Sequence, residues 1–149
     1  MKKIYIIMIV LLILTAAGCT KKDVTKYNYT YKGENDSWSA VYQTAGTVTF
    51  TEKKGKLDKE RESNEELLLT YKGELTDLSS VRHMEILYET STGKEKRVTD
   101  YETGESIQSK TFSLKSSGKG SAIPIENDII KVTITLDDDV QSFELKESK

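Results

Sequence analysis

Most of the chain alternates between apolar and polar residues with a period of two. Such alternation puts successive side chains on opposite faces of an extended chain, so it predicts strands with one buried face. The clearest case is the segment 130–136, where Ile, Val, Ile and Leu alternate with Lys, Thr and Thr. Helical spacing is confined to Leu75, Leu78 and Val81, which predict a single helical turn. We therefore expect an all-β fold with one short helical turn.

The expected strands are short and are separated by residues that favour turns. The charged segment 52–66 contains Gly55 and predicts a solvated hairpin tip with polar arms, with a linker as the alternative. The polar segment 95–106 predicts a long mobile loop or a weak edge hairpin. About seven to nine strands at this spacing favour an antiparallel two-sheet sandwich of immunoglobulin-like type, and a small barrel is the alternative. The expected buried faces are 27/29/31, 38/40/42, 48/50, 67/69/71, 84/86/88, 112/114, 130/132/134/136 and 143/145.

The N-terminus departs from this pattern. Lys2 and Lys3 precede an uninterrupted apolar run from Ile4 to Leu14. As a helix this run would rise only about 16 Å, roughly half the hydrocarbon thickness of a bilayer. It is too short for a stable membrane span and predicts a signal peptide.

Small residues follow the apolar run and end at the only cysteine of the chain: Ala16, Ala17 and Gly18 precede Cys19. This arrangement resembles the lipobox of prokaryotic lipoproteins, although Ala16 stands where that family usually has Leu. The resemblance implies a cut between Gly18 and Cys19, a diacylglyceryl group on the Cys19 thiol, and a new N-terminus that stays in the membrane. Two acyl chains give durable anchoring. An ordinary secreted protein cut near Ala17 is the alternative.

These observations divide the chain into a signal peptide (1–18), a tether (19–26) and a β domain (27–149). Residues 20–26 carry no apolar pattern and reach at most about 25 Å when fully extended. We therefore expect the domain to lie close to the outer face of the cytoplasmic membrane.

The charge balance argues against nucleic-acid binding, and the cysteine content rules out an internal disulfide. The net charge is −2, and removal of Lys2 and Lys3 with the leader takes it to −4. This balance argues against a nucleic-acid partner, because phosphate binding requires a basic surface. A single cysteine cannot form an internal disulfide.

Candidate catalytic groups are few. His83 is the only histidine, so any catalytic triad would need it, and no Gly-x-Ser-x-Gly motif is present. The Ser-x-x-Lys pattern of penicillin-binding enzymes occurs at 91–94 and 116–119, but both matches lie in expected glycine turns rather than at a helix start. We expect no catalytic residues and interpret His83 as an ordinary surface residue of a strand.

We also expect no metal and no other cofactor. One histidine and a lipidated cysteine cannot supply the three or four ligands of a zinc site. The run Asp137-Asp138-Asp139 could approach calcium, but it lacks the glycine and the distal glutamate of a calcium loop. A solvated acidic turn is the favoured interpretation.

The aromatic rows offer the one candidate for ligand binding. Tyr29, Tyr31, Trp38 and Tyr42 could form a platform on which sugars of a cell-wall glycan stack. The same pattern is what the core of a sandwich requires, and the core is the favoured interpretation.

Part of the body resembles small lipoproteins of Gram-positive bacteria that begin with an aromatic Tyr-x-Tyr-x-Gly-Glu strand followed by a Trp. Here the matching residues are Tyr29, Tyr31, Gly33, Glu34 and Trp38, together with 71–73 and 75–81. The resemblance implies no activity. The first hypothesis is a non-catalytic binding or interaction module that recognises an envelope protein, peptide or wall polymer. An envelope hydrolase or its inhibitor, and an accessory subunit of a membrane complex, are the alternatives.

Overall fold

The structure is a computed structural model that describes residues 21–53, 55–120 and 126–148. The signal segment, Gly18 and Cys19 lie outside these residues. The described chain is all-β, as the alternation predicted, with one 3-10 helix. Its elements are β1 (Lys21–Glu34), β2 (Trp38–Lys53), β3 (Lys56–Tyr71), η1 (Leu75–Leu78), β4 (His83–Thr90), β5 (Gly93–Asp100), β6 (Thr111–Gly120), β7 (Ile130–Leu136) and β8 (Asp139–Glu147).

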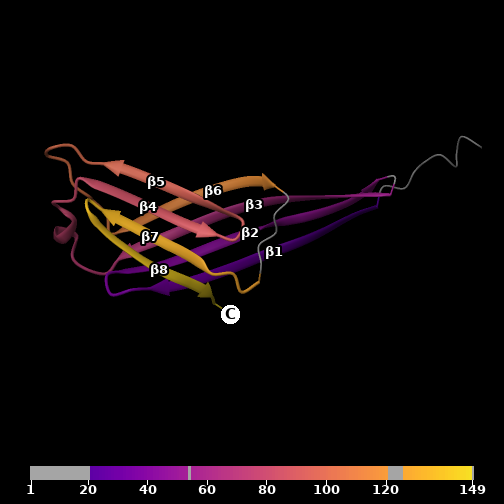
Figure 1. Ribbon diagram of the computed structural model, residues 1–149, viewed down its shortest axis with the longest axis horizontal. Helices are drawn as coiled ribbons and strands as arrows, with labels where there is room; N and C mark the ends of the chain where they lie inside the picture. Colours follow the sequence, from indigo (N-terminus) through magenta and orange to yellow (C-terminus); the bar gives the residue numbers. More distant parts are fainter. Residues whose placement is uncertain (1–20, 54, 121–125, 149) are drawn as a thin grey trace, which may run out of the picture.

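The strands form one antiparallel sheet in the order β5-β4-β7-β8-β1-β2-β3-β6. The sheet bends until its two edge strands, β5 and β6, face each other (Figure 1). A side-chain hydrogen bond crosses the remaining gap, where Arg97 Nη1 donates to the carbonyl oxygen of Ser113 over 3.0 Å. The sheet is therefore nearly closed into a barrel, and the expected two-sheet sandwich is not confirmed.

The joint between β1 and β8 explains why the sheet can bend so sharply. These strands share only the pairs Tyr31–Glu147 and Lys32–Lys146, whereas β1 and β2 pair over the whole of β1. Gly33 follows the joint, and a Cβ there would lie 2.1 Å from the carbonyl oxygen of Glu144. The absence of a side chain at this position lets the two halves of the sheet approach.

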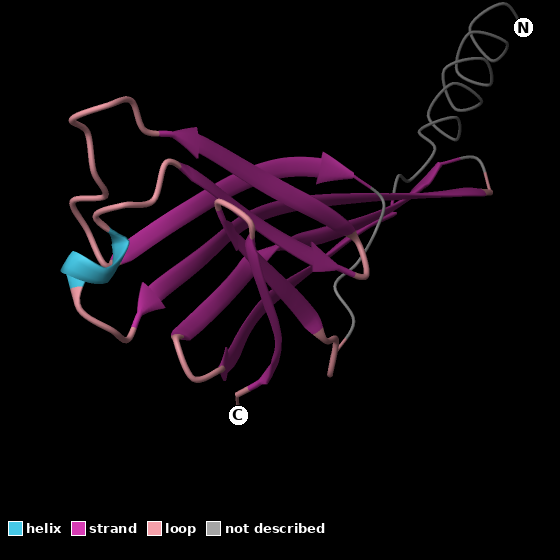
Figure 2. Ribbon diagram, turned by 60° about the vertical axis from the view of Figure 1, so that its left-hand side comes forward, coloured by secondary structure: helices cyan, strands magenta, loops and turns pink. Residues whose placement is uncertain are grey.

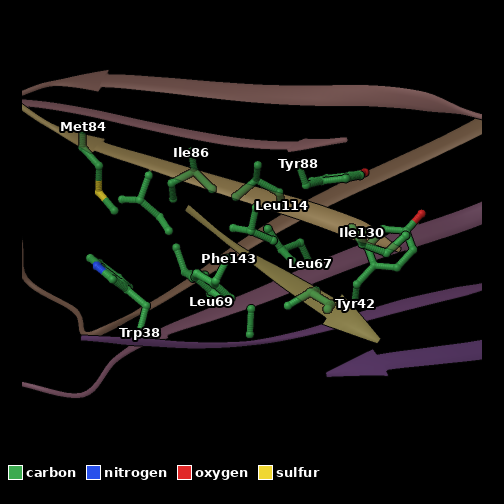
Figure 3. Packing of buried hydrophobic residues seen from close by; sticks show 14 of the residues in the cluster. Trp38, Tyr42, Leu67, Leu69, Met84, Ile86, Tyr88, Leu114, Ile130 and Phe143 are labelled. Atoms are coloured by element: carbon green, nitrogen blue, oxygen red, sulfur yellow. The ribbon is translucent and has the colours of Figure 1, made fainter. Parts of the chain in front are cut away.

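The inward faces of the strands enclose one core, as Figure 3 shows for the side chains that point toward one another from opposite walls. Trp38, Leu67 and Leu69 are fully buried, and Trp38 packs on the rings of Tyr71 and Phe112 at centroid distances of 4.9 and 6.1 Å. The other members of the core are Tyr31, Ala40, Tyr42, Leu78, Val81, Met84, Ile86, Tyr88, Ile107, Leu114, Ile130, Val132, Ile134, Phe143 and Leu145.

The helix η1 lies at one end of the barrel (Figure 2). Leu78 and Val81 are buried and Leu75 packs against the core, so the three-residue spacing is confirmed as a single turn. Asp77 and Glu74 form a capping box that satisfies amides at its start.

Strand β1 begins at Lys21, six residues before the expected start of the domain. Residues 21–26 pair with β2, from Lys21 opposite Glu52 to Lys26 opposite Thr47. The expected tether 19–26 is therefore a strand over its described part. Backbone pairing to a neighbour holds an exposed strand without requiring apolar side chains, which is why the hydropathy pattern did not reveal it.

Beyond the end of β6 the sheet narrows to three strands, which we call the ribbon: Lys21–Thr25, Val48–Lys53 and Lys56–Arg61. Four residue steps separate Thr25 from Lys21, so the ribbon projects about 13 Å. It points away from the barrel on the side opposite η1 (Figures 1 and 2). Its tip contains Gly55 at φ +74°, which confirms the hairpin predicted for 52–66.

The polar segment 95–106 divides into two parts. Residues up to Asp100 belong to the edge strand β5, which pairs with β4 over its full length, and those beyond form an irregular connection. The edge-hairpin alternative is therefore correct for β5.

Among the described residues, no helix has the length and apolar character needed to cross a bilayer.

Candidate functional site

A cavity of about 230 Å³ opens at the end of the barrel from which the ribbon projects. We call it the mouth cavity. One wall comes from the inward faces of β3 and β6, and the other comes from Tyr88 and the turn between β4 and β5. Its lining residues are Arg61, Ser63, Glu65, Tyr88, Thr92, Gly93, Lys94, Glu95, Ser116, Gly118, Lys119 and Gly120.

The wall of the mouth cavity on β3 carries a buried ion pair. Arg61 pairs with Glu65, and their side chains are only 10 and 15 % exposed. Arg61 Nη2 also donates to Ser63 Oγ over 2.7 Å. The three residues alternate along β3, so they share the face that, deeper in the barrel, carries Leu67 and Leu69. The barrel interior therefore changes from apolar to charged at its mouth.

Two tyrosines lie where the apolar core meets this ion pair. Burial raises the pKa of Tyr42 and of Tyr88 far above 10, and the negative charge of Glu65 raises both further. Both phenols are therefore neutral at physiological pH. The hydroxyls of Tyr88 and Thr44 are buried, and each lies beside a polar side chain: Tyr88 beside the Glu65 carboxylate, and Thr44 beside Tyr42. The Tyr88 ring and the Glu65 carboxylate both line the mouth cavity and give it a polar base.

The rim of the mouth cavity is polar and carries both signs of charge. Lys94 and Glu95 lie on β5, and Lys119 on β6 pairs with Glu62 at 2.7 Å. Gly93, Gly118 and Gly120 have open space where a Cβ would be. The charged side chains of the rim suit a ligand that offers several hydrogen-bond donors and acceptors, such as a peptide segment or a sugar.

A second, shallower depression of about 520 Å³ lies on the outer face of β1, β2, β3 and β6. Strand register places Asn28, Ala45, Asn64 and Ser117 in one row across these strands. Apart from Glu65, which also lines the mouth cavity, its lining carries no buried charge and no apolar base, so the mouth cavity is the better candidate.

The aromatic residues proposed as a platform lie mostly inside the protein. Tyr31, Trp38 and Tyr42 are at most 2 % exposed and belong to the core, as the favoured interpretation held. Tyr29 is half-buried and stacks on Tyr27 with centroids 6.0 Å apart. Of the four proposed platform residues, Tyr29 is the one whose ring a ligand could reach.

The imidazole ring of His83 has one hydrogen-bond partner among the described residues. Its Nδ1 lies 2.6 Å from Asp100 Oδ1 on the neighbouring strand β5, and both side chains are substantially exposed. A histidine held by a carboxylate is two thirds of a catalytic triad. No hydroxyl or thiol of the described chain completes the triad at the ring.

Asp137 and Asp138 of the acidic run form the turn between β7 and β8, and Asp139 begins β8. Asp137, at φ 51°, accepts the backbone amides of Arg82 and His83 at 2.9 and 2.8 Å. These two hydrogen bonds lower the pKa of Asp137. The described residues contain no cluster of three or more potential metal ligands. Through its two hydrogen bonds, the carboxylate of Asp137 links the β7–β8 turn to the start of β4.

The two Ser-x-x-Lys matches fall on different elements. Ser91 lies in the β4–β5 turn, as predicted, and its Oγ donates to Asp128 over 2.6 Å. Ser116 and Lys119 lie on β6 rather than in a turn. Neither pair is on a helix, which the chemistry of that motif requires.

Sequence reasoning missed the mouth cavity. Arg61, Ser63 and Glu65 lie in a segment of dense mixed charge, which by itself indicates a solvated hairpin arm. Their alternation in register with Leu67 and Leu69 was the available signal, because it continues the inward face of β3.

Comparison with known proteins found no matching family model and no matching curated protein.

Proposed function

We propose that this chain is a membrane-anchored lipoprotein of the cell envelope that acts as a non-catalytic binding module, with its ligand site in the mouth cavity. The anchor is a diacylglyceryl group on Cys19, and the β domain lies on the outer face of the cytoplasmic membrane. The partner is an envelope protein, a peptide or a wall polymer. We also propose that the nearly closed sheet is arranged as two facing halves, in the manner of an immunoglobulin-like sandwich.

The buried Arg61–Glu65 pair beside an open cavity is the observation that carries the binding function. Partly dehydrated charges interact more strongly with a polar ligand than charges in bulk water do. Retaining such a pair costs desolvation free energy that apolar residues of similar size would avoid. A polar cluster at the base of an accessible cavity has a clear use in recognition, and Tyr88, whose hydroxyl lies beside Glu65, belongs to that cluster.

Site-specific crosslinking in intact cells tests the binding function. A photoreactive residue at Lys94 lies on the rim of the mouth cavity, and a matched one at Asp138 lies in the β7–β8 turn at the opposite end of the barrel. We expect a defined adduct from position 94 alone, identified by mass spectrometry. Arg61→Met/Glu65→Leu should abolish the adduct while the protein still accumulates. Equal adducts from positions 94 and 138 would contradict the proposed site.

The anchor has its own test. Cys19→Ala should release the protein from the membrane fraction, and Cys19→Ser should do the same because neither side chain can form the thioether. Mass analysis of the native N-terminus should find two acyl chains on Cys19. An unmodified residue 19 would contradict the anchor and leave the mouth cavity unaffected as a candidate site.

The envelope hydrolase remains a second candidate on one observation, the His83–Asp100 pair at 2.6 Å. His83→Ala should leave binding at the mouth cavity unchanged under our proposal. Loss of a measured turnover in that variant would favour the enzyme instead.

A further inference from the structure

The tip of the ribbon is basic although the chain as a whole is acidic. The ends of its three strands place Lys21, Lys22, Lys53 and Lys56 together around Gly55, with Glu52 and Asp58 as the acidic residues at the same levels of the three strands. All four lysines are exposed, and none takes part in an ion pair within the described part of the chain. Their charges are available to an external partner.

Apolar side chains accompany these lysines. Leu57 is 66 % exposed at the tip itself, and Val24 is 49 % exposed on the first strand of the ribbon. Exposed apolar side chains flanked by lysines form the combination that binds the interface of a membrane with anionic lipids. The lysines attract the headgroups, and the apolar side chain enters the acyl boundary.

The position of the ribbon tip selects a membrane as the partner. Lys21 is the residue at the tip end of β1. Cys19 lies two positions before it in the sequence, and the apolar run 4–14 lies upstream of Cys19. Two residues span at most about 7 Å, so a lipidated Cys19 would keep the tip at the headgroup layer.

We propose that the ribbon tip is a second membrane contact, in which Lys21, Lys22, Lys53 and Lys56 bind anionic phospholipid headgroups and Leu57 enters the acyl boundary. It deepens the proposed function, since it rests on the Cys19 anchor for its placement in the cell. The contact itself does not need the acyl chains. It restrains the angle between barrel and membrane, which a single flexible attachment would leave open.

Vesicle partitioning of residues 20–149 tests the contact without the acyl chains. This piece contains every strand and every core residue that the structure describes. We expect it to bind vesicles containing phosphatidylglycerol and not vesicles of phosphatidylcholine alone, with binding that falls as salt rises. Each lysine at an anionic surface contributes about fivefold to the partition coefficient. Lys53→Gln/Lys56→Gln should therefore lower it about 25-fold.

Two controls make the test specific. Lys131→Gln/Lys146→Gln removes the same charge from β7 and β8, which take no part in the ribbon, and should change binding less than twofold. Leu57→Trp should shift its emission to the blue on anionic vesicles, whereas Val140→Trp, at a position 63 % exposed, should not. Equal binding to both lipid compositions, or an equal loss in the two lysine pairs, would overturn the proposal. Vesicle binding by residues 20–149, together with an unmodified Cys19 in the native protein, would overturn the anchor and leave the ribbon contact standing.

Discussion

Three tyrosine phenols lie inside the barrel, where ionisation would place a negative charge in an apolar interior. Burial is the main cause in each case: it raises the pKa of Tyr31 to about 12, and those of Tyr42 and Tyr88 further. Because each phenol has a higher pKa in the folded state than in the unfolded chain, its contribution to the free energy of unfolding is complete at pH values below the unfolded-state pKa of about 10. It is lost as the pH rises above that value. The fold should therefore weaken in alkali.

Tyr88→Phe isolates one of these groups. Its hydroxyl is buried beside Glu65, and one buried hydrogen bond contributes modestly, so at pH 7 the free energy of unfolding should stay within about 1.5 kcal/mol of the wild type. Above pH 10 the variant should lose stability less steeply, by up to about 1.4 kcal/mol per pH unit. Denaturant unfolding at pH 7, 10 and 11 measures both effects. Identical slopes above pH 10 would show that Tyr88 ionises as easily when folded as when unfolded.

Neighbouring leucines on β3 test the assignment of its two faces. Leu69 is fully buried and Leu68 is 40 % exposed on the outer face. Leu69→Ala should cost about 2–5 kcal/mol through lost burial and the cavity left behind. Leu68→Ala should cost about 1 kcal/mol or less. Thermal unfolding compares the two, and equal costs would contradict the register of β3.

At the scale of elements, the short β1–β8 ladder is the weakest link in the sheet. It joins two larger ladders through two residue pairs, and Gly33 permits the close approach there. A methyl group at Gly33 would overlap Glu144 and Leu145, so the strands would have to separate.

Gly33→Ala should therefore cost about 1–3 kcal/mol, the usual range for overpacking. Amide hydrogen exchange should locate the damage, because Ser148 donates its amide to Thr30 at this joint and would lose protection first. Gly93→Ala is the matched control, since nothing lies within 4 Å of the added Cβ. Equal destabilisation by both substitutions would show that the joint does not limit stability.

Elements buried on one face could be predicted from sequence, and elements held only by backbone pairing could not. The segments 84–88 and 130–136 alternate regularly because the core covers one face of each, so their positions were correct. Residues 21–26 have no such face and pair with β2 through their backbone alone. The closure of the sheet was also hidden, because hydropathy identifies the buried face of a strand but not which strand lies beside it.

At the scale of the whole molecule, the N-terminal end of β1, the ribbon tip and the mouth cavity all lie toward one end of the barrel. The opposite end is filled by η1, Trp38 and the buried residues around them (Figures 2 and 3). If Cys19 is acylated, the ribbon holds the barrel about 13 Å from the membrane with its mouth toward the lipid. A paired three-stranded ribbon resists bending far more than seven unpaired residues would. The mouth cavity would then bind its ligand in the narrow layer of solvent beside the membrane.

Energy transfer to a membrane acceptor tests this orientation in the acylated, full-length protein. Fluorophores at Lys94 and Asp138 lie at opposite ends of the strands that line the barrel, about 20 Å apart along the strand direction. With an acceptor on the lipid headgroups, transfer from position 94 should exceed transfer from position 138. Lys53→Gln/Lys56→Gln should reduce the difference, because the acyl chains would then be the only attachment and the barrel could tilt. Equal transfer from both positions in the wild type would mean that the ribbon does not set the orientation. Greater transfer from position 138 would place the mouth cavity away from the membrane.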